Sequence, residues 1–332
     1  MSRLAVIGAG SWGTALAIAL ASRFDSVHLW ARDCERAAEI TRLRENRRYL
    51  AGFSLPRHVE VSCDLRLAAA DADMILCVVP STHVRGVLHR IRPYLSAGAR
   101  VVSGSKGLEG NTLYRMSQVA SEVLGRPSSP PIAVLSGPTF AREVAAGEPA
   151  ALVIASEDAS AAEEIQRVFC TPRLRLYVSQ DVIGVEIGAA LKNVIAIGAG
   201  ICRGLGLGSN SVAALVTRGL AEITRLAVTM GGNSRTLSGL AGLGDLVLSA
   251  TGDLSRNRFV GIQLGEGRKL DQILAGMSMV AEGVGTCRAA HQLGIQKHVS
   301  LPIINKMHEV LYESKNPRQA LRELMERPLT SE

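Results

Sequence analysis

Aromatic residues are scarce in this chain, where Phe, Trp and Tyr make up 4% of 332 residues. The basic residues form no long run. Proteins that bind single-stranded nucleic acid combine a basic groove with aromatic stacking platforms, so nucleic acid is not the expected partner. The formal net charge is nonetheless +7, from 37 basic and 30 acidic residues. A basic protein with scattered cations suits a small anionic ligand, and we expect a phosphorylated small molecule.

Cysteine and histidine patterns typical of metal sites are also missing. The seven histidines form no H-x-x-x-H pattern and no cluster with cysteines, so no metal is predicted. The six cysteines are widely spaced and include no C-x-x-C pair, which favours reduced thiols and a cytoplasmic location. They are Cys34, Cys63, Cys77, Cys170, Cys202 and Cys287.

The chain has few uninterrupted hydrophobic runs. The longest apolar segment, from Val185 to Ile201, is broken by Glu186, Lys192 and Asn193, so we expect no stable insertion into a membrane. Apolar residues make up 47% of the chain, and 33 residues are glycine. This composition is typical of a globular protein, and the length suggests two domains.

Short apolar segments alternate with helix-length segments in the first half. This alternation predicts an α/β domain with a doubly wound parallel sheet of the Rossmann type. The predicted strands are Leu4–Ile7, Ser26–Trp30, Met74–Val79, Arg100–Ser103, Ile132–Leu135, Ala151–Ala155 and one near Arg175–Tyr177.

The second half contains no further strand pattern and predicts an all-helical C-terminal domain. We place the domains at residues 1–180 and 181–332. The predicted helices are Val182–Arg203, Ser211–Met230, Asn257–Glu266, Leu270–Ala275, Thr286–Leu293, Pro302–Tyr312 and Pro317–Met325.

A glycine-rich turn follows the first predicted strand and begins a helix. Its sequence is Gly8-Ala9-Gly10-Ser11-Trp12-Gly13, the G-x-G-x-x-G fingerprint of dinucleotide binding. The second predicted strand ends near Arg32, where an acid would suit NAD and a cation would suit the 2′-phosphate of NADP. Asp33 follows directly, so both cofactors stay possible, with NADP favoured by the arginine.

Seven short motifs occur along the chain in a characteristic order. They are Gly8–Gly13 with Trp12, Val79-Pro80-Ser81, Ser105–Glu109, Ser136–Ala141, Leu191–Val194, Gly242–Leu246 and Ser255-Arg256-Asn257. This set resembles the bacterial type of NAD(P)-dependent glycerol-3-phosphate dehydrogenase from about residue 3 to residue 320. One departure is Ala51, where the family usually carries proline, in the loop that contains the implied cofactor contact Tyr49.

The resemblance implies reversible hydride transfer between a nicotinamide and C2 of dihydroxyacetone phosphate or sn-glycerol 3-phosphate. This reaction supplies the glycerol backbone of phospholipids, and the resemblance also implies a homodimer. Two other interpretations stay open. One is a related two-domain dehydrogenase of a β-hydroxy acid, and the other is a non-catalytic NADP-binding sensor.

Reduction of a ketone requires a proton donor and a partner for the developing alkoxide. Lys192 interrupts an apolar helical stretch, where burial lowers the pKa of a lysine toward values useful for proton transfer. Lys106 follows a predicted strand at the sheet edge where such domains bind ligands, and the resemblance makes it a site residue. Asp245, in a glycine-rich loop, orients Lys192 or a substrate hydroxyl, or caps the helix that follows.

Ser255, Arg256 and Asn257 open a predicted helix, where backbone N–H groups and a guanidinium are suited to a phosphate. Other site residues come largely from the resemblance. Gly137, Thr139 and Asn193 are expected near the substrate, whereas Ala141, Arg256, Val280 and Glu282 are expected to contact the cofactor.

Overall fold

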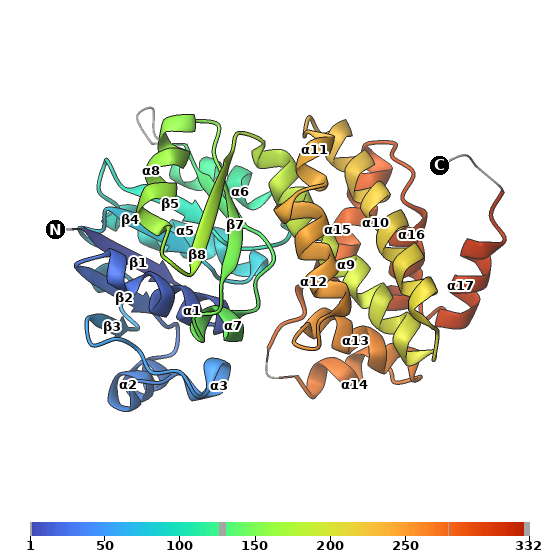
Figure 1. The fold of residues 1–332 in the computed structure, drawn as a ribbon, viewed down its shortest axis with the longest axis horizontal. Coiled ribbons are helices and arrows are strands. Elements are labelled where there is room, and N and C mark those ends of the chain that lie inside the picture. Colours follow the sequence, from blue (N-terminus) through green and yellow to red (C-terminus); the bar gives the residue numbers. More distant parts are fainter. Residues whose placement is uncertain (1, 126–130, 278, 329–332) are drawn as a thin grey trace. The chain divides into compact units, whose positions relative to one another are not determined.

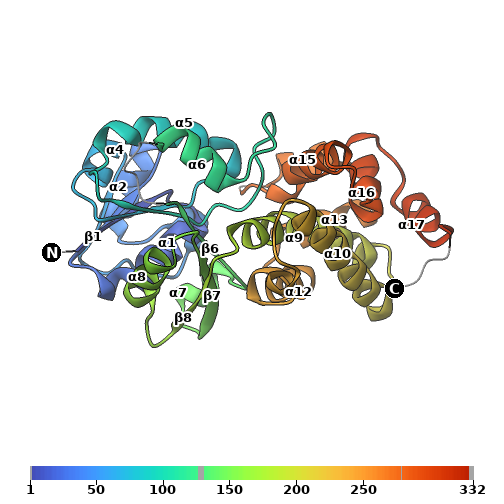
Figure 2. The same cartoon turned by 90° about the horizontal axis from the view of Figure 1, so that it is seen from above.

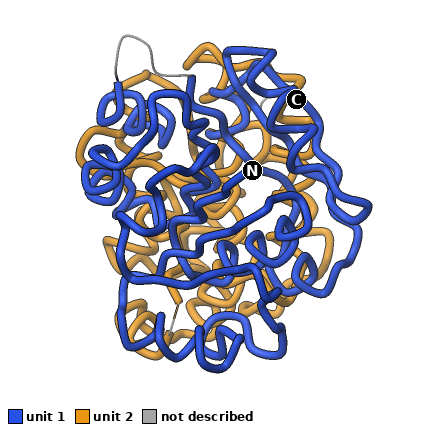
Figure 3. The backbone as a smooth tube through the Cα atoms, turned by 90° about the vertical axis from the view of Figure 1, so that its left-hand side faces the viewer, with its two compact units in different colours: residues 1–106, 114–186 blue, residues 107–113, 187–332 orange. Residues whose placement is uncertain are grey.

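The computed structural model describes residues 2–125, 131–277 and 279–328. The chain forms two compact units, coloured separately in Figure 3. The first contains residues 1–106 and 114–186, and the second contains residues 107–113 and 187–332.

An eight-stranded sheet forms the centre of the first unit (Figure 1), in the order β3-β2-β1-β4-β5-β6-β7-β8. Pairing is parallel from β3 to β6, and this 3-2-1-4-5-6 order is that of dinucleotide-binding domains. The strands are β1 (Arg3–Ile7), β2 (Ser26–Trp30), β3 (Val59–Ser62), β4 (Met74–Cys77), β5 (Arg100–Ser103), β6 (Ala133–Ser136), β7 (Ala150–Ala155) and β8 (Leu174–Ser179).

Helices cover both faces of this sheet, as Figure 2 shows. Because side chains alternate along a strand, Leu4 and Val6 of β1 join the core on one face, and Ala5 and Ile7 join the core on the other. The helices of this unit are α1 (Ser11–Leu20), η1 (Ala21–Arg23), α2 (Cys34–Leu43), α3 (Arg47–Leu50), α4 (Leu65–Ala69), η2 (Ser81–His83), α5 (Val84–Ile91), η3 (Arg92–Tyr94), α6 (Met116–Leu124), α7 (Ala141–Ala145) and α8 (Ala159–Phe169).

The fold class predicted from the sequence is confirmed, with two differences in the sheet. The pairing of β6 with β7 is antiparallel, so the sheet is mostly rather than entirely parallel. The connection between these strands contains only the short α7, whereas parallel neighbours need a longer crossover. The prediction also missed β3, a four-residue edge strand in which Glu60 is exposed.

The second unit is helical. The long helix α9 (Val182–Gly204) begins at the end of the first unit and continues through the second. The others are α10 (Ser209–Thr229), α11 (Ser234–Leu237), the π-helical turn η4 (Leu240–Gly244), α12 (Asp245–Thr251), α13 (Arg256–Gly265), α14 (Leu270–Ala275), α15 (Glu282–Gln296), α16 (Pro302–Tyr312) and α17 (Pro317–Met325). The sequence-based prediction missed α11 and η4, whereas the helix expected after Asp245 corresponds to α12.

Helix α9 is the centre of this unit. It is long and apolar enough to cross a membrane, but 94% of its most apolar window is buried inside the structure, as in a core helix. It packs so closely on α13 that a Cβ on Gly261 would stand 1.9 Å from the carbonyl oxygen of Ile197. A Cβ on Gly200 would likewise stand 2.1 Å from the carbonyl oxygen of Arg258. Only glycine permits this approach, which fixes the polar residues of α9 relative to α13.

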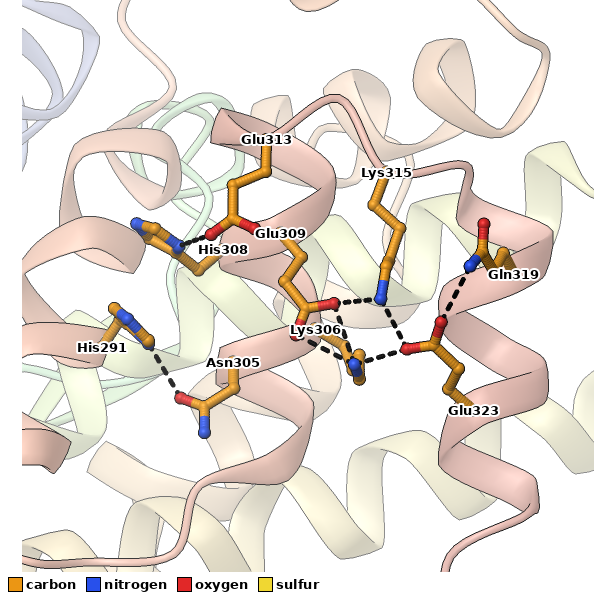
Figure 4. Close-up of polar contacts among 9 residues, drawn as sticks. All are labelled: His291, Asn305, Lys306, His308, Glu309, Glu313, Lys315, Gln319 and Glu323. Carbon is orange, nitrogen blue, oxygen red and sulfur yellow. Dashed lines mark hydrogen bonds and ion pairs between the residues drawn. The ribbon is translucent and has the colours of Figure 1, made fainter.

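Charged side chains hold α17 to α16 (Figure 4). Lys306 of α16 forms ion pairs with Glu309 and with Glu323 of α17. Lys315, between the two helices, pairs with the same two glutamates. These contacts attach the last helix by electrostatics in addition to apolar packing.

The prediction that all six cysteines are reduced is wrong for one pair. Cys34 and Cys63 form a disulfide, with Cα atoms 5.0 Å apart and a separation of 29 positions in sequence. The spacing gave no signal, because pairing of β2 with β3 brings the start of α2 beside the end of β3. Four cysteines are free, namely Cys77, Cys170, Cys202 and Cys287.

Candidate active site

The glycine-rich turn lies between β1 and α1, as predicted. Gly8 has φ +125°, which favours glycine, and a Cβ on Gly13 would stand 1.9 Å from the carbonyl oxygen of Gly8. By contrast, no atom lies within 4 Å of a Cβ placed on Gly10, the residue before α1. The turn is therefore tightly packed at its first and third glycines and open at its second. An open backbone at a helix N-terminus fits the pyrophosphate of a dinucleotide.

A buried asparagine supports this turn from outside the fingerprint. Asn46 Nδ2 donates hydrogen bonds to the carbonyl oxygen of Ala9 at 3.0 Å and to Thr14 Oγ1 at 2.8 Å. Asn46 is completely buried. The sequence analysis did not identify it, because nothing in the local pattern indicates a contact with residues 32 and 37 positions away.

The end of β2 carries the residues expected to distinguish NAD from NADP. Arg32 is exposed, and Asp33 caps α2 by accepting a hydrogen bond from the backbone N–H of Arg36 at 3.2 Å. The Arg36 guanidinium also lies 3.5 Å from the Asp33 carboxylate and donates to Tyr49 Oη at 2.9 Å. Asp33 is therefore engaged by its own helix, and a second arginine, missed from sequence, lies beside Tyr49.

The loop that departs from the family pattern keeps the backbone that proline would require. Ala51 has φ −64° and ψ 144°, and proline fixes φ near −65°. The Ala51 carbonyl oxygen accepts a hydrogen bond of 3.3 Å from Arg142 in α7. Substitution of proline by alanine at this position thus preserves the loop conformation and its anchor next to Ala141.

Three predicted substrate residues of the first unit gather at one carbonyl oxygen. Lys106 Nζ and Thr139 Oγ1 each donate to the carbonyl oxygen of Gly137 at 3.3 Å. Lys106 follows β5, and Gly137 and Thr139 follow β6, its parallel neighbour. All three therefore lie at the carboxyl ends of adjacent strands, where ligands bind in such sheets.

Lys192 lies on α9 and is 5% exposed. Its Nζ forms an ion pair with the completely buried Asp245 and donates to Ser249 Oγ at 2.8 Å. A buried ammonium group needs such partners because it has lost its hydration. Asp245 follows the π-helical turn η4, a type of irregularity that is frequent at functional sites.

The role of Asp245 as a helix cap is not supported. Asp245 is the first residue of α12, and the capping position belongs to Gly244, which has no side-chain cap. The carboxylate is directed to Lys192 instead, as the other interpretation expected. Ser249, one turn later on α12, was missed because its 57-residue separation from Lys192 leaves no local signal.

An amide bridge connects three helices next to this lysine. Asn257 of α13 donates through Nδ2 to Asn193 Oδ1 of α9 at 3.0 Å. Its Oδ1 accepts a 3.0 Å hydrogen bond from the backbone N–H of Gly283 in α15. Both residues were predicted to contact substrate, and the structure places their side chains in contact with each other.

The residues flanking Asn257 have separate partners. Ser255 caps α13 by accepting from the backbone N–H of Arg258 at 3.3 Å. Arg256 is exposed and donates to the carbonyl oxygen of Val280 at 2.9 Å. Partial loss of hydration around its guanidinium lowers the pKa of Arg256, and the nearby Glu282 carboxylate acts in the opposite direction. The predicted trio of Arg256, Val280 and Glu282 is thus brought together within the second unit.

Comparison with known proteins identifies the family. Residues 3–162 match the model of the N-terminal domain of NAD-dependent glycerol-3-phosphate dehydrogenase, and residues 181–322 match that of its C-terminal domain. The glycerol-3-phosphate dehydrogenase (NAD(P)+) of Koribacter versatilis is 53% identical over 334 residues, covering 100% of this chain and 99% of that protein. This chain belongs to the glycerol-3-phosphate dehydrogenase family.

Other members of the family agree. The enzyme of the same name from Syntrophotalea carbinolica is 50% identical and covers 99% of both chains. The crystal structure of glycerol-3-phosphate dehydrogenase from Coxiella burnetii has a TM-score of 0.94 and 39% identity, covering 98% of this chain and 99% of that one. The resemblance recognised from seven motifs is confirmed, and these relatives support neither of the two alternative interpretations.

Proposed function

We propose that this chain interconverts dihydroxyacetone phosphate and sn-glycerol 3-phosphate with NADP or NAD as hydride carrier. The observation that carries the proposal is the buried Lys192, held by Asp245 and Ser249. A buried charge of this kind is costly to maintain, and such groups cluster at catalytic sites. Family membership identifies the reaction as reduction of a ketone by hydride, and this reaction needs a proton donor such as a lysine.

In the reducing direction, C2 of the ketone gains a hydride and its oxygen gains a proton. The nicotinamide supplies the hydride when it is bound. Lys192 Nζ donates the proton to the carbonyl oxygen, and before transfer its positive charge stabilises the negative charge that develops there. Asp245 and Ser249 keep the ammonium group in place, and in the oxidising direction Lys192 accepts the proton back.

The remaining site residues bind substrate and cofactor in this proposal. Lys106, Gly137, Thr139, Asn193, Asp245 and the Ser255–Asn257 turn bind the substrate, and Arg256 with the first N–H groups of α13 binds its phosphate. The Gly8–Gly13 turn holds the pyrophosphate. The other proposed cofactor contacts are Arg32, Tyr49, Lys106, Ala141, Arg256, Val280 and Glu282.

We propose a preference for NADPH over NADH. Arg32 is exposed at the end of β2, and Arg36 lies close by, whereas the Asp33 carboxylate is engaged with α2. A carboxylate that is already paired is a poor acceptor for the ribose 2′-hydroxyl. Two guanidinium groups at this position are well suited to a 2′-phosphate.

The cellular context of the proposal follows the family. Residues 1–180 form the dinucleotide-binding domain and residues 181–332 form the helical substrate and catalytic domain, in a cytoplasmic homodimer that supplies glycerol 3-phosphate for phospholipids. The experiment that tests the activity is oxidation of NADPH and of NADH with dihydroxyacetone phosphate, followed by absorbance. Dihydroxyacetone, which lacks the phosphate, is the control substrate. Absence of turnover with both cofactors would refute the proposal.

A further inference from the structure

The Cys34–Cys63 disulfide lies next to the proposed site for the adenosine end of the cofactor. Cys34 is the first residue of α2 and follows Arg32 by two positions, and Cys63 follows β3 directly. The Cys63 carbonyl oxygen accepts a 2.9 Å hydrogen bond from Trp30 Nε1 at the end of β2. The two cysteines thus flank the end of the strand that presents Arg32.

This pair is accessible, unlike most of the other cysteines. Cys34 is exposed and Cys63 is half-buried. Three of the four free cysteines, Cys77, Cys202 and Cys287, are buried, and burial raises the pKa of Cys77 to about 11 and that of Cys287 to about 12. Those thiols have little reactive thiolate near neutral pH. Among the described cysteines, the Cys34–Cys63 disulfide is therefore the most accessible to thiol reagents. The fourth free cysteine, Cys170, is half-buried and has no disulfide partner.

The segment that the disulfide closes contains Arg36, one of the two arginines proposed to recognise the 2′-phosphate, and the proposed cofactor contact Tyr49. Arg36 and Tyr49 lie within it and are hydrogen-bonded to each other, and the Arg48 guanidinium lies 5.5 Å from the centre of the Tyr49 ring. The disulfide attaches the beginning of this segment, at α2, to its end after β3. It therefore restrains the position of α2, and with it Arg36, relative to Arg32.

We propose that Cys34 and Cys63 form a reversible dithiol–disulfide pair whose oxidation state controls how tightly the 2′-phosphate of NADP is bound. This inference rests on the proposed function and adds regulation to its cofactor site. In a cytoplasmic protein a disulfide is rare, and where one occurs it is usually catalytic or redox-sensing. Its natural reagents are low-molecular-weight disulfides for oxidation and dithiols for reduction.

The exchange proceeds in two steps. In oxidation, the Cys34 thiolate attacks one sulfur of the reagent disulfide, forming a mixed disulfide and releasing one reagent thiolate. The Cys63 thiolate then attacks Cys34 Sγ, forming the internal bond and releasing the second thiolate. The two protons from the cysteines end on the two reagent thiols, so the protein loses two electrons and the reagent gains them. Reduction by a dithiol reverses both steps.

The oxidised form should bind NADPH more tightly, because a restrained site loses less conformational freedom on binding. We expect reduction to raise the Kd for NADPH by about 3- to 10-fold and to change the Kd for NADH by less than about 2-fold. The difference arises because only NADPH carries the phosphate that Arg32 and Arg36 are proposed to contact.

The test uses the full chain in two states, treated with oxidised or with reduced dithiothreitol and then freed of reagent. Alkylation of the protein in denaturant, followed by intact mass, counts the thiols, which should be four in the oxidised state and six in the reduced state. NADPH and NADH are then titrated into each state by fluorescence. The Cys34→Ser/Cys63→Ser variant should bind NADPH like the reduced protein under both treatments. Cys170→Ser, which changes a free, half-buried cysteine, is the matched control and should respond as the wild type does.

Two outcomes would overturn the inference while leaving the proposed function intact. One is a count of six thiols under both treatments with normal NADH binding. The other is an unchanged ratio of NADPH to NADH affinity between states that differ in thiol count. Failure to bind either dinucleotide in both states would instead overturn the proposed function and this inference with it. Titration of the wild type in its two states needs no variant to fold.

Discussion

Removing the charge of Lys192 tests its proposed chemical role and at the same time disturbs its structural role. In the variant Lys192→Met, the side chain keeps its length but loses the ammonium group, so the completely buried Asp245 carboxylate loses this partner. Leaving one member of a buried ion pair behind costs about 3–5 kcal/mol. A stability loss of this size lowers the unfolding midpoint by about 2–4 °C for each kcal/mol and could itself reduce measured activity.

A second substitution corrects the stability without restoring the chemistry. Lys192→Met combined with Asp245→Asn removes both charges, so the double variant should recover most of the lost stability. Both variants should lose kcat by about 10²- to 10⁴-fold, the usual contribution of general acid–base catalysis. Binding of NADPH should survive in both, because the Gly8–Gly13 turn is unchanged.

The assays are steady-state kinetics with dihydroxyacetone phosphate and thermal unfolding of each variant. Lys315→Met is the matched control, because Lys315 also forms ion pairs but lies far along the chain on the charged cluster of α16 and α17 (Figure 4). Such solvent-screened pairs contribute little to stability, so this variant should keep its kcat. A double variant that retains a tenth or more of wild-type kcat would refute Lys192 as the proton donor. Equal stability of the single and double variants would refute the energetic argument.

Three further predictions concern the cofactor, the substrate phosphate and pH. Arg32→Ala should weaken NADPH binding by about 1.5–3 kcal/mol and leave NADH nearly unchanged, as measured by fluorescence titration. Equal losses for both would mean that Arg32 supports the fold or binds the pyrophosphate that both cofactors share. Arg256→Leu should lower kcat/KM for dihydroxyacetone phosphate by about 10²-fold or more and change that for dihydroxyacetone little, whereas an equal loss would show that Arg256 does not bind the phosphate. Burial raises the pKa of Glu222, which accepts from the backbone N–H groups of Ile303 and Ile304, from 4.5 to about 7. Its contribution to stability is fully present below pH 4.5 and is lost as the pH rises through about 7, by about 3 kcal/mol. Glu222→Gln should therefore flatten the dependence of Tm on pH in this range, and an unchanged slope would contradict the assignment.

Local chemistry accounts for what could be predicted from the sequence. The Gly8–Gly13 turn was recognisable because its glycines are required by backbone geometry within a few residues. The structure shows this requirement at Gly8, which has a positive φ, and at Gly13, where a Cβ would clash with the Gly8 carbonyl oxygen. Lys192 was recognisable because a charge in an apolar helix must have a partner. The identity of that partner was harder, since the Asp245 contact spans 53 residues and the Ser249 contact spans 57.

Long-range pairing explains the errors. Cys34 and Cys63 become neighbours only because β2 pairs with β3, and β3 was itself missed as a short, half-exposed strand. Because the edge strand β3 was not predicted, the two cysteines were wrongly predicted to be reduced. The antiparallel direction of β7 was missed for a similar reason. The direction of a strand depends on where the preceding connection ends, and the apolar pattern of the strand does not reveal it.

The Ser255-Arg256-Asn257 turn shows how a correct local prediction can still mislead about side chains. The three residues do begin a helix, as expected. Successive residues on a helix point in directions about 100° apart, so three consecutive side chains do not readily meet at one ligand. In the structure Ser255 caps its own helix, Asn257 bridges Asn193 and Gly283, and Arg256 reaches Val280. The proposed recognition of the phosphate therefore rests on Arg256 and on the backbone N–H groups of the first turn. This makes Arg256 the one position of the three where substitution should separate the phosphorylated substrate from its neutral analogue.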